Sequence, residues 1–212
     1  MDGGCCGGSC GGGGSRRPAG GSGDLKHTMR ISMVVNGLLA ALLLAAADAT
    51  QAVSLWAAGL LVLNHAASNG VALAGMGQAP EWRVRLSAVQ GVALAVAAVV
   101  LVVAAGRSIA GMAFPDVPLA SLALLFAIGV TVVASTLLFA GRRGTLTPRA
   151  IWLCSRKNVL PLGAGLAGLA ASWLLLDGAP DALVGAGVAA ILLPAAFGLM
   201  RGGMADEGMK QP

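Results

Sequence analysis

Residues Leu86 to Gly106 read LSAVQGVALAVAAVVLVVAAG and contain no charged side chain. A helix of about 20 apolar residues, rising 1.5 Å per residue, crosses the hydrocarbon core of a bilayer, which is about 30 Å thick. This stretch therefore predicts a transmembrane helix. Apolar residues make up 57% of the 212-residue chain and charged residues only 11%, so we expect a membrane protein rather than a soluble domain.

Five further apolar stretches accompany the first one, and polar residues separate them. They are Ile31 to Ala47, Val53 to Gly77, Leu119 to Gly141, Val159 to Leu176 and Ala182 to Met200. Each is long enough to span a bilayer as a helix. The sequence thus predicts an all-α membrane protein, with a six-transmembrane-helix bundle over residues 29–201 and short loops between the helices.

The two ends of the chain are predicted to be cytoplasmic tails. Residues 1–28 are rich in Gly and Cys and contain no apolar run that could offset the entropy of ordering, so we expect a flexible tail there. Residues 202–212 form a second, short tail. Cys5, Cys6 and Cys10 would stay reduced in the cytoplasm, which predicts a soft-metal site or a redox thiol; an inert low-complexity tract is the alternative.

The Lys and Arg side chains predict the orientation of the bundle. Thirteen of the 14 fall on one predicted side, and Arg107 is the exception. The side of Arg107 instead carries four aspartates, which are Asp48, Asp116, Asp177 and Asp181. Because short loops rich in Lys and Arg stay in the cytoplasm during insertion, we expect a multi-pass protein of the inner (plasma) membrane with both termini cytoplasmic.

The start of the chain has a competing interpretation. Arg16 and Arg17 precede an apolar run that ends in AAADA, a pattern that also resembles a secretory signal with its cleavage site. The run is long for a signal peptide, and cleavage would leave an odd number of spans. We therefore expect the first apolar stretch to remain as a membrane helix.

Several function classes do not fit this composition. The net charge is +5, but the basic residues do not cluster on a polar domain, so we expect no nucleic-acid partner. Four cysteines in 212 residues do not make a disulfide scaffold. No cluster of a catalytic acid, base and nucleophile occurs within the apolar stretches, so we do not expect an enzyme.

A few large polar side chains lie within the apolar stretches and are the candidates for a site. They are Asn36, Asn64, His65, Asn69 and Gln90, with Cys154 and Asn158 at the start of the fifth stretch. The i, i+4 spacing of His65 and Asn69, and of Cys154 and Asn158, places each pair on one helix face. Two facing pairs would form a four-ligand pocket, in which imidazole and thiolate suit zinc and the neutral amides are poorer ligands. The alternative is a set of interhelical hydrogen bonds, worth about 0.6–2 kcal/mol each.

Glycines are frequent in the last two apolar stretches. They are Gly163, Gly165, Gly168, Gly185 and Gly187. Small residues allow the backbones of membrane helices to approach closely. We interpret these glycines as packing positions, because neither a strand nor a basic residue accompanies them as in a phosphate-binding loop.

The predicted bundle resembles the transmembrane domain of the cation diffusion facilitator family of metal efflux proteins. The shared features are six short-looped helices, cytoplasmic termini, and paired i, i+4 positions on the second and fifth helices. Thr147 to Ser172, TPRAIWLCSRKNVLPLGAGLAGLAAS, is similar to the start of the fifth helix in compact members of that family. Pro180 to Arg201, PDALVGAGVAAILLPAAFGLMR, is similar to their sixth helix. The resemblance covers about Met29 to Arg201, and a cysteine-bearing N-terminal tail also fits those members.

The resemblance implies a membrane cation transporter that exports a zinc-like or soft heavy-metal ion across the inner membrane. The family builds its transport site from Asp and His, at positions that map to His65, Asn69, Cys154 and Asn158. Asn69 and Asn158 stand where the family has a carboxylate, which leaves one imidazole and one thiolate as the main ligands. The three cysteines of the tail would capture the ion.

The metal ion is the cargo in this interpretation, and no resident cofactor is required. The lipid bilayer and the metal cation are the expected partners, and the bundle could form a homodimer. The alternative function is a non-transporting membrane protein that keeps a degenerate metal site and has a binding or structural role.

The distribution of cations predicts the topology, which reporter fusions can test. The fusion sites are Asp48, Arg85, Asp116, Arg143, Asp177 and Gln211. We expect cytoplasmic signals at Arg85, Arg143 and Gln211 only, because these positions lie on the side that carries thirteen cations. An external signal at Gln211 would contradict both the orientation and the even number of spans.

Overall fold

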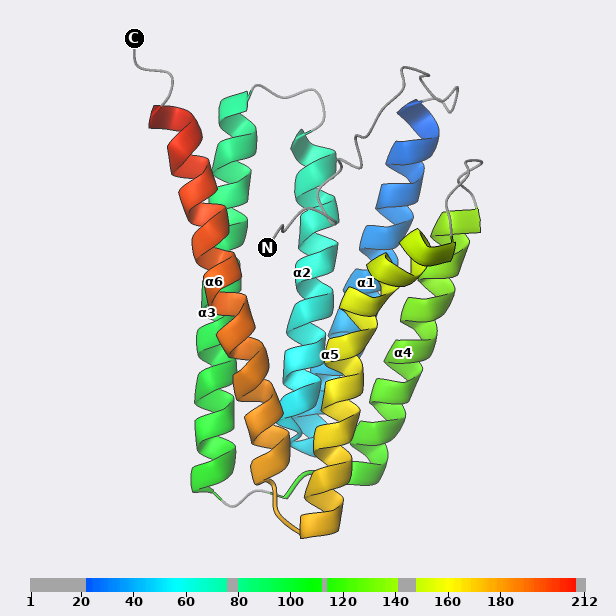
Figure 1. Cartoon of the computed structure of the whole chain (residues 1–212), viewed down its shortest axis with the longest axis vertical. Coiled ribbons are helices and arrows are strands. Elements are labelled where there is room, and N and C mark those ends of the chain that lie inside the picture. The colour runs from blue at the N-terminus through cyan, green and yellow to red at the C-terminus, as the bar shows by residue number, and fades with distance from the viewer. Residues whose placement is uncertain (1–21, 76–79, 112–113, 141–147, 209–212) are drawn as a thin grey trace.

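The computed structural model of the chain describes residues 22–75, 80–111, 114–140 and 148–208. The described residues form six α-helices and no β-strand, which confirms the predicted all-α class (Figure 1). The helices are α1 (Ser22–Thr50), α2 (Val53–Gly75), α3 (Pro80–Ala110), α4 (Val117–Ala140), α5 (Pro148–Leu175) and α6 (Ala179–Gly208). Helix α1 thus begins before the predicted domain boundary at Met29, and α6 continues past Arg201.

Five of the helices contain segments that are long and apolar enough to cross a membrane. These segments are Met29–Thr50, Val53–Gly75, Val84–Ala110, Val117–Ala134 and Ala179–Arg201. The apolar part of α5, Val159–Leu175, is shorter and rises about 26 Å at 1.5 Å per residue. The length and composition of the five long segments identify a multi-pass membrane protein, and a sixth crossing by α5 stays a prediction.

The helices run alternately up and down the bundle (Figure 1). Helices α2, α4 and α6 begin at the end of the bundle where α1, α3 and α5 finish. We call this the aspartate end, because its aspartates are Asp48, Asp116, Asp177 and Asp181. The opposite end carries Arg30, Arg85 and Arg201 and is called the cation end. The predicted separation of charges is therefore present among the described residues, while the side of the membrane that each end faces stays a prediction.

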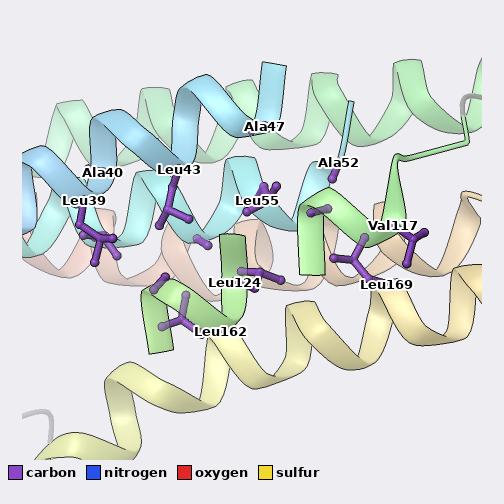
Figure 2. Close-up of a cluster of buried hydrophobic side chains, with 14 residues drawn as sticks. Leu39, Ala40, Leu43, Ala47, Ala52, Leu55, Val117, Leu124, Leu162 and Leu169 are labelled. Atoms are coloured by element: carbon purple, nitrogen blue, oxygen red, sulfur yellow. The ribbon is translucent and has the colours of Figure 1, made fainter. Parts of the chain in front are cut away.

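Helix α2 is the centre of the bundle, because it packs against each of the other five helices. The two larger buried clusters both include residues of α2. The first joins α1, α2, α4 and α5 through side chains such as Leu43, Leu55, Leu124 and Leu169, all fully buried (Figure 2). The second joins α2 to α3 and α6, which pair with each other along the opposite flank. Burying these large side chains keeps α2 in place between the two groups of helices.

The packing is denser near the aspartate end. In α1 the buried residues begin at Leu39 and run to Thr50, and in α4 they run from Val117 to Ala127, with none between 128 and 134. In α2 seven of the ten residues 53–62 are buried, and after them only Ala66 and Gly75 are. Among the side chains that the structure describes, those in the cation-end halves of α1, α2 and α4 are therefore packed less closely than those in the other halves.

Glycines allow close approach between α6 and its neighbours, and two of them lie in these contacts near the aspartate end. A Cβ atom at Gly185 would collide with Cγ1 of Val53 in α2, and one at Gly168 of α5 would lie 2.7 Å from Cγ2 of Val184 in α6. In contrast, a Cβ atom at Gly187 would meet nothing within 4 Å. The absence of a side chain at Gly185 and Gly168 thus sets how closely α2, α5 and α6 can pack.

We expect the substitution Gly185→Ala to destabilise the protein by about 1–3 kcal/mol, because the added methyl group must displace Val53 or separate two helices. Gly187→Ala is the matched control on the same helix and should leave stability unchanged or slightly raised. Denaturant-induced unfolding in detergent, followed by circular dichroism, measures both. Equal stability of the two variants would contradict the close α2–α6 contact.

Candidate functional site

The middle of α2 carries the sequence NHAASN, with polar side chains at Asn64, His65, Ser68 and Asn69. On a helix, Asn64 and Ser68 share one face, and His65 and Asn69 share the adjacent one. Because α2 is surrounded by five helices, these faces meet different neighbours. His65 lies twelve residues after Val53, which places it about 18 Å along the helix from the aspartate end.

The face with Asn64 and Ser68 is hydrogen-bonded to α3. Nε2 of Gln90 donates to Oδ1 of Asn64 at 3.2 Å and to Oγ of Ser68 at 2.5 Å. The Ser68 hydroxyl in turn donates to the backbone carbonyl oxygen of Asn64 at 2.9 Å. These partly buried groups satisfy one another, so this cluster acts as a polar contact between α2 and α3.

Asn69 is hydrogen-bonded to α1. Its Nδ2 donates to Oγ of Ser32 at 3.1 Å, and Nδ2 of Asn36 donates to the carbonyl oxygen and Oγ of the same serine, at 2.8 and 3.2 Å. This is the kind of interhelical contact that the second interpretation of the sequence predicts. This hydrogen bond uses Nδ2 of Asn69, so Oδ1 of the same side chain is still available to bind a ligand.

His65 differs from its polar neighbours. It is partly buried in the middle of the bundle, and it forms no hydrogen bond or ion pair with any residue in the described ranges. Each nitrogen of an imidazole requires a donor or an acceptor, and water is scarce in a bilayer core. Among the large polar side chains of α2, His65 is therefore the one whose presence is not explained by a hydrogen bond between described residues.

The remaining predicted ligands lie beyond what the structure describes. Cys154 and Asn158 belong to α5, which packs against α2, but their side chains are outside the described part. Cys5, Cys6 and Cys10 lie outside the described residues altogether. Within the described ranges, no three His, Cys, Asp or Glu side chains form a group that could hold a metal ion. The four-ligand pocket thus stays a prediction.

The structure reveals that Asp181 is a buried acid. The sequence predicted only the side of the membrane on which this residue lies. Asp181, in the first turn of α6, is 1% exposed. Its Oδ2 accepts a hydrogen bond from the backbone N–H of Val53 at 2.6 Å, and the N–H of Ser54 donates to Oδ1 at 3.2 Å. The backbone N–H of Asp181 donates to Oγ of Ser172 in α5 at 3.1 Å. One residue thereby joins α2, α5 and α6.

The sequence contains a signal for this contact. The first N–H groups of a helix have no partner within it, and Ser, Thr, Asp or Asn just before the helix normally accepts one of them. The residues before α2 are Gln51 and Ala52, which are poor capping residues. The missing local cap indicates that an acceptor comes from elsewhere in the fold, although it does not identify which one.

Two further aspartates cap helices at the same end. Oδ1 of Asp116 accepts a hydrogen bond from the N–H of Leu119 at the start of α4, at 3.4 Å. Oδ1 of Asp177 accepts one from the N–H of Ala179 at the start of α6, at 3.0 Å. The starts of α2, α4 and α6 thus each have a carboxylate, which also suits the partial positive charge of a helix N-terminus. These three aspartates are explained by helix structure, whereas Asp48 lies in the last turn of α1 and caps none of the described helix starts.

No protein-family model matches the chain, and no curated protein sequence matches it. The resemblance to cation diffusion facilitators therefore stays a prediction from the residues that carry it.

We expect Asp181→Ala to lower the free energy of unfolding by about 2–4 kcal/mol, because it leaves the buried N–H groups of Val53 and Ser54 without an acceptor. Asp181→Asn retains one side-chain oxygen and should lose less. Asp177→Ala, which removes an exposed cap, is the comparison and should cost about 1 kcal/mol. Unfolding in detergent measures all three, and a stability of Asp181→Ala equal to that of wild type would refute the contact.

Proposed function

We propose that the protein is a membrane cation transporter that exports a zinc-like or soft metal ion, and that His65 binds the ion midway through the bundle. The observation that carries this proposal is the imidazole of His65 on the central helix, which has no hydrogen-bond partner among the described residues. An ionisable side chain inside a membrane is costly unless it serves a ligand, a proton or a path. Imidazole nitrogen is a good ligand for zinc and copper ions.

The distribution of packing supports a path from the cation end to His65. The polar residues Ser32, Asn36, Asn69 and Gln90 lie at the level of His65 or nearer the cation end, where α1, α2 and α4 are less closely packed. Beyond His65, the apolar clusters and the Asp181 contact close the bundle toward the aspartate end. Alternating access would therefore require the contacts at the aspartate end to open.

The ligand chemistry favours a soft ion. In this proposal the thiolate of Cys154 on α5 completes the site with His65, and the oxygens of Asn69 and Asn158 are secondary ligands. Imidazole and thiolate together select soft or borderline metals such as Cu(I) and Zn(II), whereas they suit Mg²⁺ or Ca²⁺ poorly. The cysteines of the tail, Cys5, Cys6 and Cys10, would bring the same class of ion to the membrane surface.

A second candidate function is a non-transporting membrane protein in which the polar residues hold the helices together. The hydrogen bonds of Asn69 to Ser32, and of Gln90 to Asn64 and Ser68, favour it. Under this alternative, His65 would also serve packing. The two functions differ in whether His65 affects ion movement.

Ion uptake into proteoliposomes tests the proposal, with Zn²⁺ and Cu⁺ assayed separately. We expect His65→Gln to reduce the initial rate at least about tenfold, because the amide that replaces the imidazole is a poorer metal ligand. The matched control is His27→Gln, which removes the other histidine, an exposed residue near the start of α1, and should leave the rate within about twofold of wild type.

Thermal melting in detergent gives an independent measure of binding. The ion that is transported should raise the melting temperature of wild type and of His27→Gln but not that of His65→Gln, because only a folded protein with the site is stabilised by mass action. Absence of uptake in wild type, together with no stabilisation by either ion, would reject transport and leave the non-transporting alternative.

A further inference from the structure

A pocket of about 500 Å³ lies at the aspartate end, between the α1–α2 junction and the last turns of α3. Its lining includes Asp48, Gln51, Trp56, Val100, Val103 and Arg107. Helices α1 and α3 each pack against α2 but not against each other within the described ranges. The pocket occupies the space that this arrangement leaves beside α2, at the level where the apolar spans of α1 and α3 end.

The two charged side chains of the pocket have opposite signs, and neither has a partner in the part of the chain that the structure describes. Asp48 lies in the last turn of α1, Arg107 in the last turn of α3, and both are exposed. Within the described ranges neither forms an ion pair, with the other or with a third residue. Arg107 is also the one cation that the described residues place at this end of the bundle. The pocket therefore offers one anion-binding group and one cation-binding group.

The remaining wall of the pocket is apolar. Val100 and Val103 are 41% and 54% exposed, and Trp56 lies beside them on α2. The valine face continues along α3 through Val96 and Val99, which are also exposed, toward the middle of the membrane span. A ligand that fits would carry both charges at one end and a hydrocarbon chain at the other, which could extend along this face.

We propose that the pocket binds one zwitterionic phospholipid whose head group ends in a primary ammonium, such as phosphatidylethanolamine. The phosphate would pair with the guanidinium of Arg107, which can donate two parallel hydrogen bonds, and the ammonium would donate to the carboxylate of Asp48. The first part of an acyl chain would pack on Trp56, Val100 and Val103. A free phosphate ion does not account for Asp48 or for the apolar wall. The inference does not depend on the proposed transport.

Native mass spectrometry of the full chain tests this site, after reconstitution with equal amounts of phosphatidylethanolamine, phosphatidylcholine and phosphatidylglycerol. We expect wild type to retain phosphatidylethanolamine preferentially. Arg107→Gln should reduce its retention about tenfold, since a charge-assisted contact is lost. Asp48→Asn should also reduce it, and should raise the retention of the anionic phosphatidylglycerol relative to wild type because the repelling carboxylate is gone.

The controls are charge-removing substitutions outside the pocket. Arg201→Gln removes an exposed cation at the cation end, and Asp177→Asn removes an exposed acid at the aspartate end while keeping an oxygen that can cap α6. Both should retain phosphatidylethanolamine as wild type does. Unfolding in detergent checks that Arg107→Gln and Asp48→Asn fold normally, which is expected because both side chains are exposed.

Three results would overturn the assignment. The first is preferential retention of phosphatidylglycerol or phosphatidylcholine by wild type. The second is unchanged retention in Arg107→Gln and Asp48→Asn. The third is an equal loss in Arg201→Gln, which would indicate a general effect of surface charge. If wild type retained phosphatidylethanolamine selectively but took up no ion, only the transport proposal would be rejected. The two proposals can therefore be tested independently.

Discussion

The helix N-terminus at Val53 imposes the constraint on which the rest of the bundle depends. The first N–H groups of α2 are buried and have no partner within the helix, so another element must supply an acceptor. Asp181 of α6 supplies it, and through Ser172 it also fixes the end of α5. One turn further along α6, Gly185 lies directly against Val53. The hydrogen bond and the close backbone approach are therefore parts of one contact, and this contact positions the helix that touches all others.

Fixing one end of the bundle has a consequence for the other end. Buried leucines and capped helix starts pack the aspartate end closely, whereas the polar residues around His65 lie where packing is looser. A bundle held at one end and looser at the other can open on one side without losing its core. This property links the fold to the proposed transport, because access to His65 from the cation end requires no rupture of the Asp181 contact, and release at the aspartate end does.

The sequence predicted the parts of the structure that depend on composition along a single helix. Leu86 to Gly106 lies within α3, and the helix directions follow from the succession of apolar stretches and short connections. The parts that depend on how helices are rotated against each other were not predictable. Gly185 and Gly187 look equivalent in the sequence, yet only Gly185 faces another helix. For the same reason the i, i+4 rule placed His65 and Asn69 on one face but could not identify Ser32 as the partner of Asn69.

If the protein transports an ion as proposed, the positions of its charged residues bear on whether that ion is divalent or monovalent. Among the described residues, Asp181 is the buried carboxylate, and its oxygens are already bonded to the start of α2, so it is not free to compensate an ion at His65. The desolvation cost of an ion rises with the square of its charge, so a monovalent ion costs about one quarter as much as a divalent ion of equal radius. A site with one imidazole, one thiolate and two neutral amides would leave Cu⁺ with no net charge and Zn²⁺ with one uncompensated positive charge. In the proposed site these ligands thus compensate the charge of Cu⁺ fully and that of Zn²⁺ only in part, which favours the soft monovalent ion as the cargo.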